Sequence, residues 1–198
     1  MNAMQTIAGA SPDVDGSPSE DPGGASPGDE PGESAPPPSH DARTVDVLDV
    51  TRCLDDRARL WLCEHAAAAL AALEVTGEIR VRLVDDLEMA RAHEAHCGVP
   101  GTTDVITFDM GSTAAEVDVD LLVCVDEARR QAATRGHHLE RELLLYVVHG
   151  VLHCLGHDDH DPEEAAAMHR REDVILESIG VGRVYAGPAP GERGVSGS

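Results

Sequence analysis

At residues 139–155 the chain reads LERELLLYVVHGVLHCL, a run of helical length that Gly156 ends. Its large apolar residues fall on almost every side of such a helix: Leu143, Leu144, Leu145, Val147, Val148, Val151, Leu152 and Leu155. A helix that is apolar all round is buried rather than lying on a surface. The segment therefore predicts a central helix enclosed by the rest of the fold.

Strand and helix patterns alternate on both sides of this central helix. Runs of alternating or continuous apolar residues predict strands at 44–50, 78–84, 104–108 and 117–125. Start and stop signals predict further helices at 54–73, 86–96, 126–135 and 162–179. Such alternation is typical of an α/β (α+β) fold, so we expect a mixed sheet with helices packed on it.

The two ends of the chain differ in composition from its centre. Residues 1–42 contain eight Asp or Glu, no Lys or Arg and eight of the twelve prolines. Such a segment cannot bury enough apolar surface to offset the entropy lost on ordering. The stretch 187–198 is again rich in Gly, Pro and Ser. We therefore expect disordered tails at 1–42 and 187–198, and one folded domain at 43–186.

Several features bear on where the protein works. The N-terminus has no cationic start followed by a long apolar run, so a secretory signal is not expected. No segment has the length and apolarity of a membrane span. The five cysteines are widely spaced and form no CxxC pair, as is common for thiols in a reducing compartment. We expect a cytoplasmic protein with no membrane partner.

The charge balance limits the choice of partners. The net charge is −22, from 15 basic and 37 acidic residues, which argues against broad electrostatic binding to nucleic acid. Aromatic rings occur only at Trp61, Phe108, Tyr146 and Tyr185, too few for a row of base-stacking platforms. Any RNA contact is therefore expected to be local, and DNA is not an expected partner.

The central helix carries two histidines on one face. His149 and His153 are four residues apart, so their imidazoles project in the same direction and can converge on one ion. After the turn that Gly156 allows, the next residues are all possible ligands: His157, Asp158, Asp159 and His160. Three protein ligands with one open position are typical of catalytic zinc. We expect one Zn2+ per chain at the end of this buried helix.

The segment HGVLHCLGHDDH at residues 149–160 resembles the signature of the YbeY family of bacterial endoribonucleases, HGxLHLxGYDH. Further family-like segments occur in the same order along the chain: TTDVITF at 102–108, DLLVCVDEA at 120–128 and AMHRREDVIL at 167–176. The resemblance thus covers nearly all of the predicted domain.

This resemblance implies a mixed α/β fold, one zinc ion and cleavage that is specific for single-stranded RNA. It also implies a role in 16S rRNA 3' end maturation and in late-stage ribosome quality control. The implied partners are ribosomal RNA and the ribosome.

The third metal ligand is where the chain departs from the family signature. The resemblance implies a histidine ten positions after the first one. Asp159 occupies that position here, and His160 comes one place later. Because a carboxylate oxygen also binds zinc well, the predicted metal ligands are His149, His153 and Asp159, with His160 as the alternative third ligand.

A second departure concerns RNA binding. Cys97 stands where many relatives have an arginine, and His96 replaces the aromatic residue before it. A cation that the resemblance implies for RNA contact is therefore missing. Other arginines could supply local phosphate contacts, namely Arg129, Arg130, Arg135 and Arg141.

Two rival functions would share the predicted metal site. Zinc proteases with an HExxH helix need the Glu after the first His as general base, and the chain has Gly150 there. A metzincin-like protease would therefore need an acid from elsewhere. A non-catalytic, ribosome-associated module would instead hold structural zinc without an open position. For the nuclease, candidate general bases are Asp120, His157 and Asp158.

Overall fold

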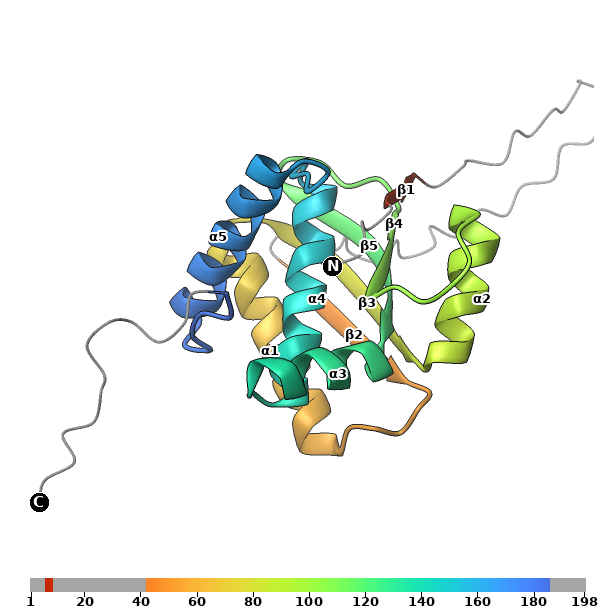
Figure 1. Cartoon of the computed structure of the whole chain (residues 1–198). Coiled ribbons are helices and arrows are strands. Elements are labelled where there is room, and N and C mark those ends of the chain that lie inside the picture. The colour runs from red at the N-terminus through yellow and green to blue at the C-terminus, as the bar shows by residue number, and fades with distance from the viewer. Residues whose placement is uncertain (1–5, 9–41, 186–198) are drawn as a thin grey trace, which may run out of the picture.

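A computed structural model of the chain describes residues 6–8 and 42–185 (Figure 1). Its strands form one sheet in the order β1-β4-β5-β3-β2. The strands are β1 (Thr6–Ala8), β2 (Arg43–Asp49), β3 (Thr76–Val84), β4 (Val105–Asp109) and β5 (Glu116–Cys124). β4 pairs antiparallel with β5, whereas the other neighbours pair in parallel. The predicted mixed sheet is therefore confirmed.

The helices of the described part of the chain are α1 (Asp56–Ala72), α2 (Asp86–Cys97), α3 (Val125–Arg135), α4 (Leu139–Cys154) and α5 (Pro162–Ser178). Each predicted helix and strand is present, with small shifts at the ends. The first helix, for example, begins after Asp55, whose carboxylate caps it by accepting from the amide of Ala58. None of the described helices combines the length and apolarity needed to cross a bilayer.

Strand β1 was not predicted, and it lies within the segment expected to be a tail. Thr6–Ala8 pairs in parallel with the end of β4, at Thr107, Phe108 and Asp109. A strand of three residues is too short for a periodic apolar pattern, so the sequence carries no signal for it. Residues 1–5, 9–41 and 186–198 lie outside the described residues. The boundaries of the two tails therefore stay predictions.

The helices lie on both faces of the sheet. α1 and α4 pack against the face that carries Val81 and Leu121, whereas α2 packs against Ile106 and Cys124 on the opposite face. α5 packs against α4 and α1 on the side away from the strands. α4 therefore lies in front of the sheet in Figure 1 and packs against α1, α3 and α5 as well as against the strands.

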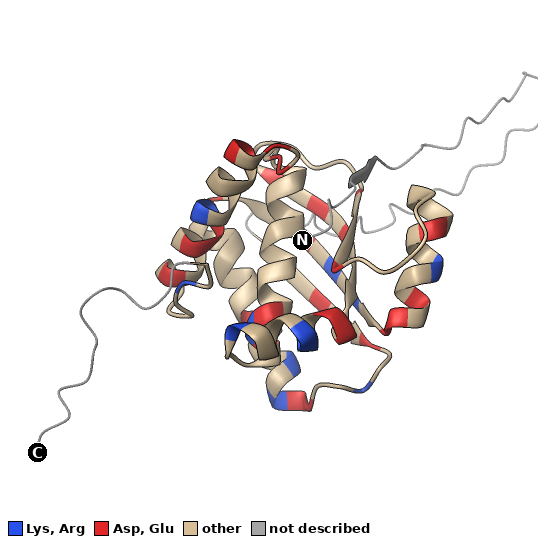
Figure 2. Ribbon diagram, viewed as in Figure 1, with Lys and Arg blue, Asp and Glu red and all other residues tan. Residues whose placement is uncertain are grey.

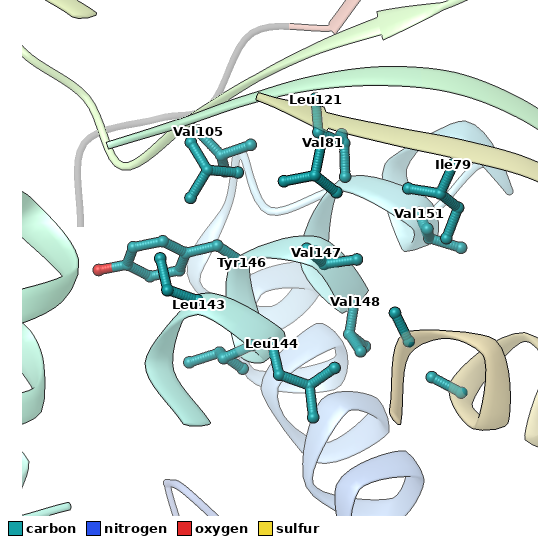
Figure 3. Packing of buried hydrophobic residues seen from close by; sticks show 14 of the residues in the cluster. Ile79, Val81, Val105, Leu121, Leu143, Leu144, Tyr146, Val147, Val148 and Val151 are labelled. Atoms are coloured by element: carbon teal, nitrogen blue, oxygen red, sulfur yellow. The ribbon is translucent and has the colours of Figure 1, made fainter. Parts of the chain in front are cut away.

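The centre of the core is α4, as its apolar circumference predicted. All residues from 142 to 152 are buried. In Figure 3, Val147 and Val151 point toward the strands that carry Val81 and Leu121. Full burial of one such side chain contributes roughly 1.5–3 kcal/mol to folding. The end of α4 that carries the two histidines is thus held on a rigid support.

Gly150 lets α4 approach the sheet closely. A Cβ atom at this position would lie 2.6 Å from Cδ2 of Leu121 and 2.9 Å from Oγ1 of Thr107. Both of those side chains are buried, so neither can swing into solvent. The glycine is therefore required by packing at the level of the two histidines.

Replacing Gly150 with Ala should destabilise the fold although alanine has the higher helix propensity. The propensity gain is about 1 kcal/mol, whereas an added methyl group in a packed core costs about 1–3 kcal/mol. We expect the free energy of unfolding to fall by up to about 2 kcal/mol in urea denaturation.

Shortening Leu121 to Val should remove part of this clash, so the double variant Gly150→Ala/Leu121→Val should lose less than the sum of the two single losses. A stability gain of about 1 kcal/mol for Gly150→Ala alone, the propensity effect without a clash, would show that the sheet does not restrict this position.

Candidate metal centre

The end of α4 and the loop after it bring the predicted ligands together. His149 and His153 lie one turn apart, with ring centroids separated by 4.7 Å. Gly156 has a φ of +85°, and the amides of Gly156 and His157 donate back into the last turn of the helix. The chain therefore reverses at once and returns Asp159 to the two histidines.

The geometry of this group fits a single ion. Nε2 of His149 and Nε2 of His153 are 3.2 Å apart. The carboxylate of Asp159 lies 3.6 Å from Nε2 of His149 through Oδ2 and 3.7 Å from Nε2 of His153 through Oδ1. Tetrahedral zinc with Zn–N bonds of about 2.0–2.1 Å separates two ligand nitrogens by ~3.3 Å. These three side chains could therefore hold one metal ion.

A buried carboxylate oxygen supports the same conclusion. The side chain of Asp159 is only 12% exposed. Its Oδ1 atom is buried and has no hydrogen-bond partner among the described residues. A carboxylate in this state is costly unless a cation compensates it. The donor set therefore suits a cation on chemical as well as geometric grounds.

His160 lies in a different environment from Asp159. Its side chain is 67% exposed, and its Nδ1 contacts the carboxylate of Asp158. Asp158, Asp159 and His160 also form a close group, but His160 is not part of the group with His149 and His153. The structure thus places Asp159, which stands at the position of the family's third histidine, beside the two helix histidines. It does not place His160 there.

Glu172 of α5 orients the first histidine. Its Oε1 atom lies 2.6 Å from Nδ1 of His149, and its side chain is fully buried. When Nδ1–H donates to this carboxylate, the lone pair of Nε2 is left facing His153 and Asp159. Glu172 was not among the predicted site residues. The available signal was a charged residue within the apolar stripe of α5, between Met168 and Leu176.

The surroundings shift the pKa values of the two histidines in opposite directions. Burial lowers the pKa of His149, but the hydrogen bond and charge of Glu172 outweigh burial and raise it above the usual range. Burial lowers the pKa of His153, and the nearby charge of His149 lowers it further. His153 is therefore the more readily neutral of the pair, as a metal ligand must be.

The candidate bases occupy different places. Asp120 lies on β5, where its carboxylate accepts from Nε of Arg80 and lines a groove on the sheet. It is held there by an arginine rather than by any group of the metal centre. His157 and Asp158 lie in the exposed loop beside Asp159. Asp104 was not predicted, yet it is close enough for its charge to raise the pKa of His149.

The arginines considered for phosphate contacts lie away from the metal group. Three of them are on α3, and each forms ion pairs. Arg129 pairs with Asp126, and Arg130 pairs with Asp86 and Glu127. Arg135 pairs with Glu142. Arg141 is in the first turn of α4, at the opposite end from the histidines. In Figure 2 the loop after α4 and the start of α5 instead carry acidic residues.

Cys97 ends α2 and packs with the small apolar cluster around Ile106. The ring of His96 meets the ring of Phe108 edge-on, with centroids 5.0 Å apart. Neither side chain replaces the cation that the resemblance implies at position 97.

The fold and this group of side chains define a class of protein: an α/β domain with three possible metal ligands gathered at the end of a buried helix. Comparison with known proteins agrees. The family model described as Endoribonuclease YbeY matches residues 49–180. The chain therefore belongs to the YbeY family of endoribonucleases, which hydrolyse phosphodiester bonds of RNA, and the resemblance seen in the sequence is confirmed.

Individual relatives are similar over most of their length. The Endoribonuclease YbeY of Brevibacillus brevis is 36% identical over 137 residues, which cover 61% of this chain and 85% of the relative. The Endoribonuclease YbeY of Frankia alni is 36% identical over 161 residues, which cover 73% of this chain and 89% of that relative. The solution structure of TM1509 from Thermotoga maritima superposes on this chain with a TM-score of 0.53 at 22% sequence identity. The matched region covers 68% of this chain and 88% of the TM1509 chain. This last likeness concerns the fold alone.

Asp159→Ala should weaken metal binding more than His160→Ala. Asp159 faces both Nε2 atoms, whereas His160 is exposed and paired with Asp158. In a zinc competition titration, loss of one of three ligands should lower affinity by at least tenfold, while His160→Ala should stay close to the parent chain. The opposite ranking would transfer the third-ligand role to His160.

Glu172→Gln should lower metal affinity about 10- to 100-fold, because an amide no longer enforces the Nδ1–H tautomer of His149. Glu177→Gln is the matched control, since Glu177 lies on the same helix but pairs with Arg183 at the surface. Both variants should keep the circular dichroism of the parent chain. Equal affinities for the two variants would remove Glu172 from the support of the site.

Proposed function

We propose that this chain is a zinc-dependent endoribonuclease that cuts single-stranded RNA. Its proposed cellular roles are 16S rRNA 3' end maturation and late-stage ribosome quality control, with the ribosome as its partner. The observation that carries the proposal is the convergence of His149, His153 and Asp159, supported by Glu172, in a member of this family.

The chemistry of the donors favours zinc over harder cations. Two imidazole nitrogens and one carboxylate oxygen match the three-ligand sets of catalytic zinc, whereas Mg2+ and Ca2+ prefer oxygen donors throughout. When bound, zinc polarises a phosphoryl oxygen and lowers the pKa of a coordinated water. We therefore propose His149, His153 and Asp159 as the ligands of one Zn2+ per chain.

The protein side chains have separate tasks in this proposal. Glu172 accepts a hydrogen bond from Nδ1–H of His149 and directs Nε2 toward the centre. Asp159 supplies negative charge from a loop that Gly156 turns back. The carboxylate of Asp158 is a weak base, because its contact with His160 lowers its pKa. The proton acceptor during RNA hydrolysis is proposed to be another group of this loop, or Asp104.

Packing at Gly150 argues against the protease alternative. A side chain at this position would meet Leu121 and Thr107 of the sheet. The general base of an HExxH protease therefore has no room there, in addition to being absent. The non-catalytic alternative, a ribosome-associated module with structural zinc, needs a fourth protein ligand. The metal group that contains both helix histidines has three members within the described residues.

The cytoplasm is the proposed location. The five cysteines are all free, and Cys53, Cys63, Cys97 and Cys154 are only partly buried. Partly exposed thiols that stay unpaired are typical of a reducing compartment.

The zinc-loaded protein should cut single-stranded RNA and leave casein intact. Chelation should abolish cutting and added zinc should restore it, and elemental analysis should find about one zinc per chain. His153→Ala should lower the cutting rate to background, because two ligands no longer fix the geometry of the ion. The assay needs low salt, since an acidic protein binds free RNA weakly.

Equal cutting by the parent chain and His153→Ala would assign the activity to a contaminant. Zinc-dependent cleavage of casein would replace the nuclease proposal by the protease alternative.

A further inference from the structure

A groove of about 550 Å³ lies far from the metal centre. Its walls come from the start of α1, the start of α4 and the chain after α5, and they include Trp61, His65, His138 and Arg141. His138 and His149 are eleven residues apart along the chain, which is ~16 Å of helix. The groove is therefore a separate feature from the metal group, and its volume is within the usual range for small-ligand sites.

One wall of the groove is an aromatic platform. The rings of Trp61 and His65 are stacked, with centroids 4.0 Å apart and planes at 23°. His65 is held in place because its Nδ1 lies 2.8 Å from the carbonyl oxygen of Trp61. Trp61 is the only tryptophan of the chain and is partly exposed beside the groove. A partly exposed indole is a surface on which a nucleobase can stack.

Two arginines line the groove next to this platform. Arg141 donates from Nη2 to the carbonyl of Arg183, and its buried Nε–H has no partner among the described residues. Arg57 is exposed and forms no ion pair in the described part of the chain. An arginine guanidinium has a geometry that suits phosphate oxygens. The groove thus pairs a stacking surface with phosphate-binding groups.

The carboxylates of the groove are compatible with such a ligand. Asp55 is occupied as the cap of α1 and accepts from the amide of Ala58. Glu140 lines the groove, and a carboxylate there can accept from the amino group of a base edge. The groove thus offers a ring for a base, arginines for a phosphate and a carboxylate for the amino group of a base edge. These three features together match one nucleotide.

We propose that the groove beside Trp61 binds one nucleotide of the single-stranded RNA substrate, at a distance from the cleaved bond. This inference rests on the proposed function, because it assigns a second contact to the same substrate. A strand can reach both places, since single-strand-binding sites commonly cover on the order of 4–16 nucleotides. The groove also supplies arginines, which the metal end of the protein lacks between residues 149 and 164.

The test uses Trp61 itself, because all tryptophan emission of the chain comes from this residue. Metal-free protein is titrated at low salt with an RNA oligomer of about six nucleotides, with GMP and with inorganic phosphate. We expect a saturable change in emission with the oligomer, weaker binding of GMP, and no change with phosphate alone. Added salt should weaken the oligomer binding.

Arg141→Gln should raise the dissociation constant of the oligomer about tenfold, the effect expected for loss of a charge-assisted hydrogen bond. Arg59→Gln is the matched control, because Arg59 lies on α1 outside the groove and pairs with Asp56. Trp61→Leu is followed with a fluorescently labelled oligomer and should also lose binding. If Trp61→Leu does not fold, the comparison of the two arginine variants still decides the question.

An unchanged emission at saturating oligomer, or equal dissociation constants for Arg141→Gln and Arg59→Gln, overturns the proposal. Binding of GMP as tight as that of the oligomer would assign the groove to a free nucleotide and overturn its role in substrate binding. Failure of the proposed function is a different result. Zinc-dependent RNA cleavage would then be absent, while the titration of metal-free protein would be unaffected.

Discussion

The candidate metal centre depends on the buried contact between His149 and Glu172. A carboxylate without exposed surface costs several kcal/mol if it is left unpaired, and Nδ1 of His149 lies 2.6 Å from its Oε1 and can donate to it. α5 must therefore pack on α4 in the one arrangement that brings these two groups together. Such an ion pair adds little net stability, because its desolvation penalty is similar to its attraction. Its effect is to fix the tautomer and direction of His149, which aims Nε2 at His153 and at the loop that carries Asp159.

The distribution of charge separates chemistry from binding. Acidic residues gather in the loop after α4 and in the first turn of α5, where Asp159 contributes to the metal group and Asp161 caps the helix. This charge suits a cation and repels an RNA strand. Arginines lie elsewhere, on α3, near the starts of α1 and α4, on β3 and α2, and further along α5. Binding energy from contacts remote from the reacting bond can hold a substrate where local electrostatics disfavour it. An acidic nuclease with a remote nucleotide contact is consistent with this arrangement.

Much of the fold follows from local sequence patterns, whereas the details of the site do not. The burial of α4 could be predicted because its apolar residues cover the whole circumference, and its end because Gly156 permits a reversal. Strand β1 could not be predicted, because its three residues, which pair with β4, are too few to show a periodic apolar pattern in the sequence. Spacing alone left Asp159 and His160 as alternatives. The loop conformation separates them, since Asp158 accepts from the amides of Asp159 and His160 and also contacts the His160 ring. The groove beside Trp61 joins three distant segments, so no local pattern indicates it.

Position 150 connects the packing of the fold to the kind of hydrolysis that it can perform. The residue after the first histidine of a metal-binding helix is the general base in HExxH proteases. In this chain the same position faces the sheet, and a Cβ atom there would lie within 3 Å of Leu121 and Thr107. A glutamate there would force Leu121 and Thr107 to shift or α4 to move away from the strands, at a cost to the packing that holds the helix. The close helix–sheet contact therefore disfavours a protease base at position 150. The absence of the base fits the packing of this core, and the proposed proton acceptor is a group of the loop or Asp104, which precedes β4.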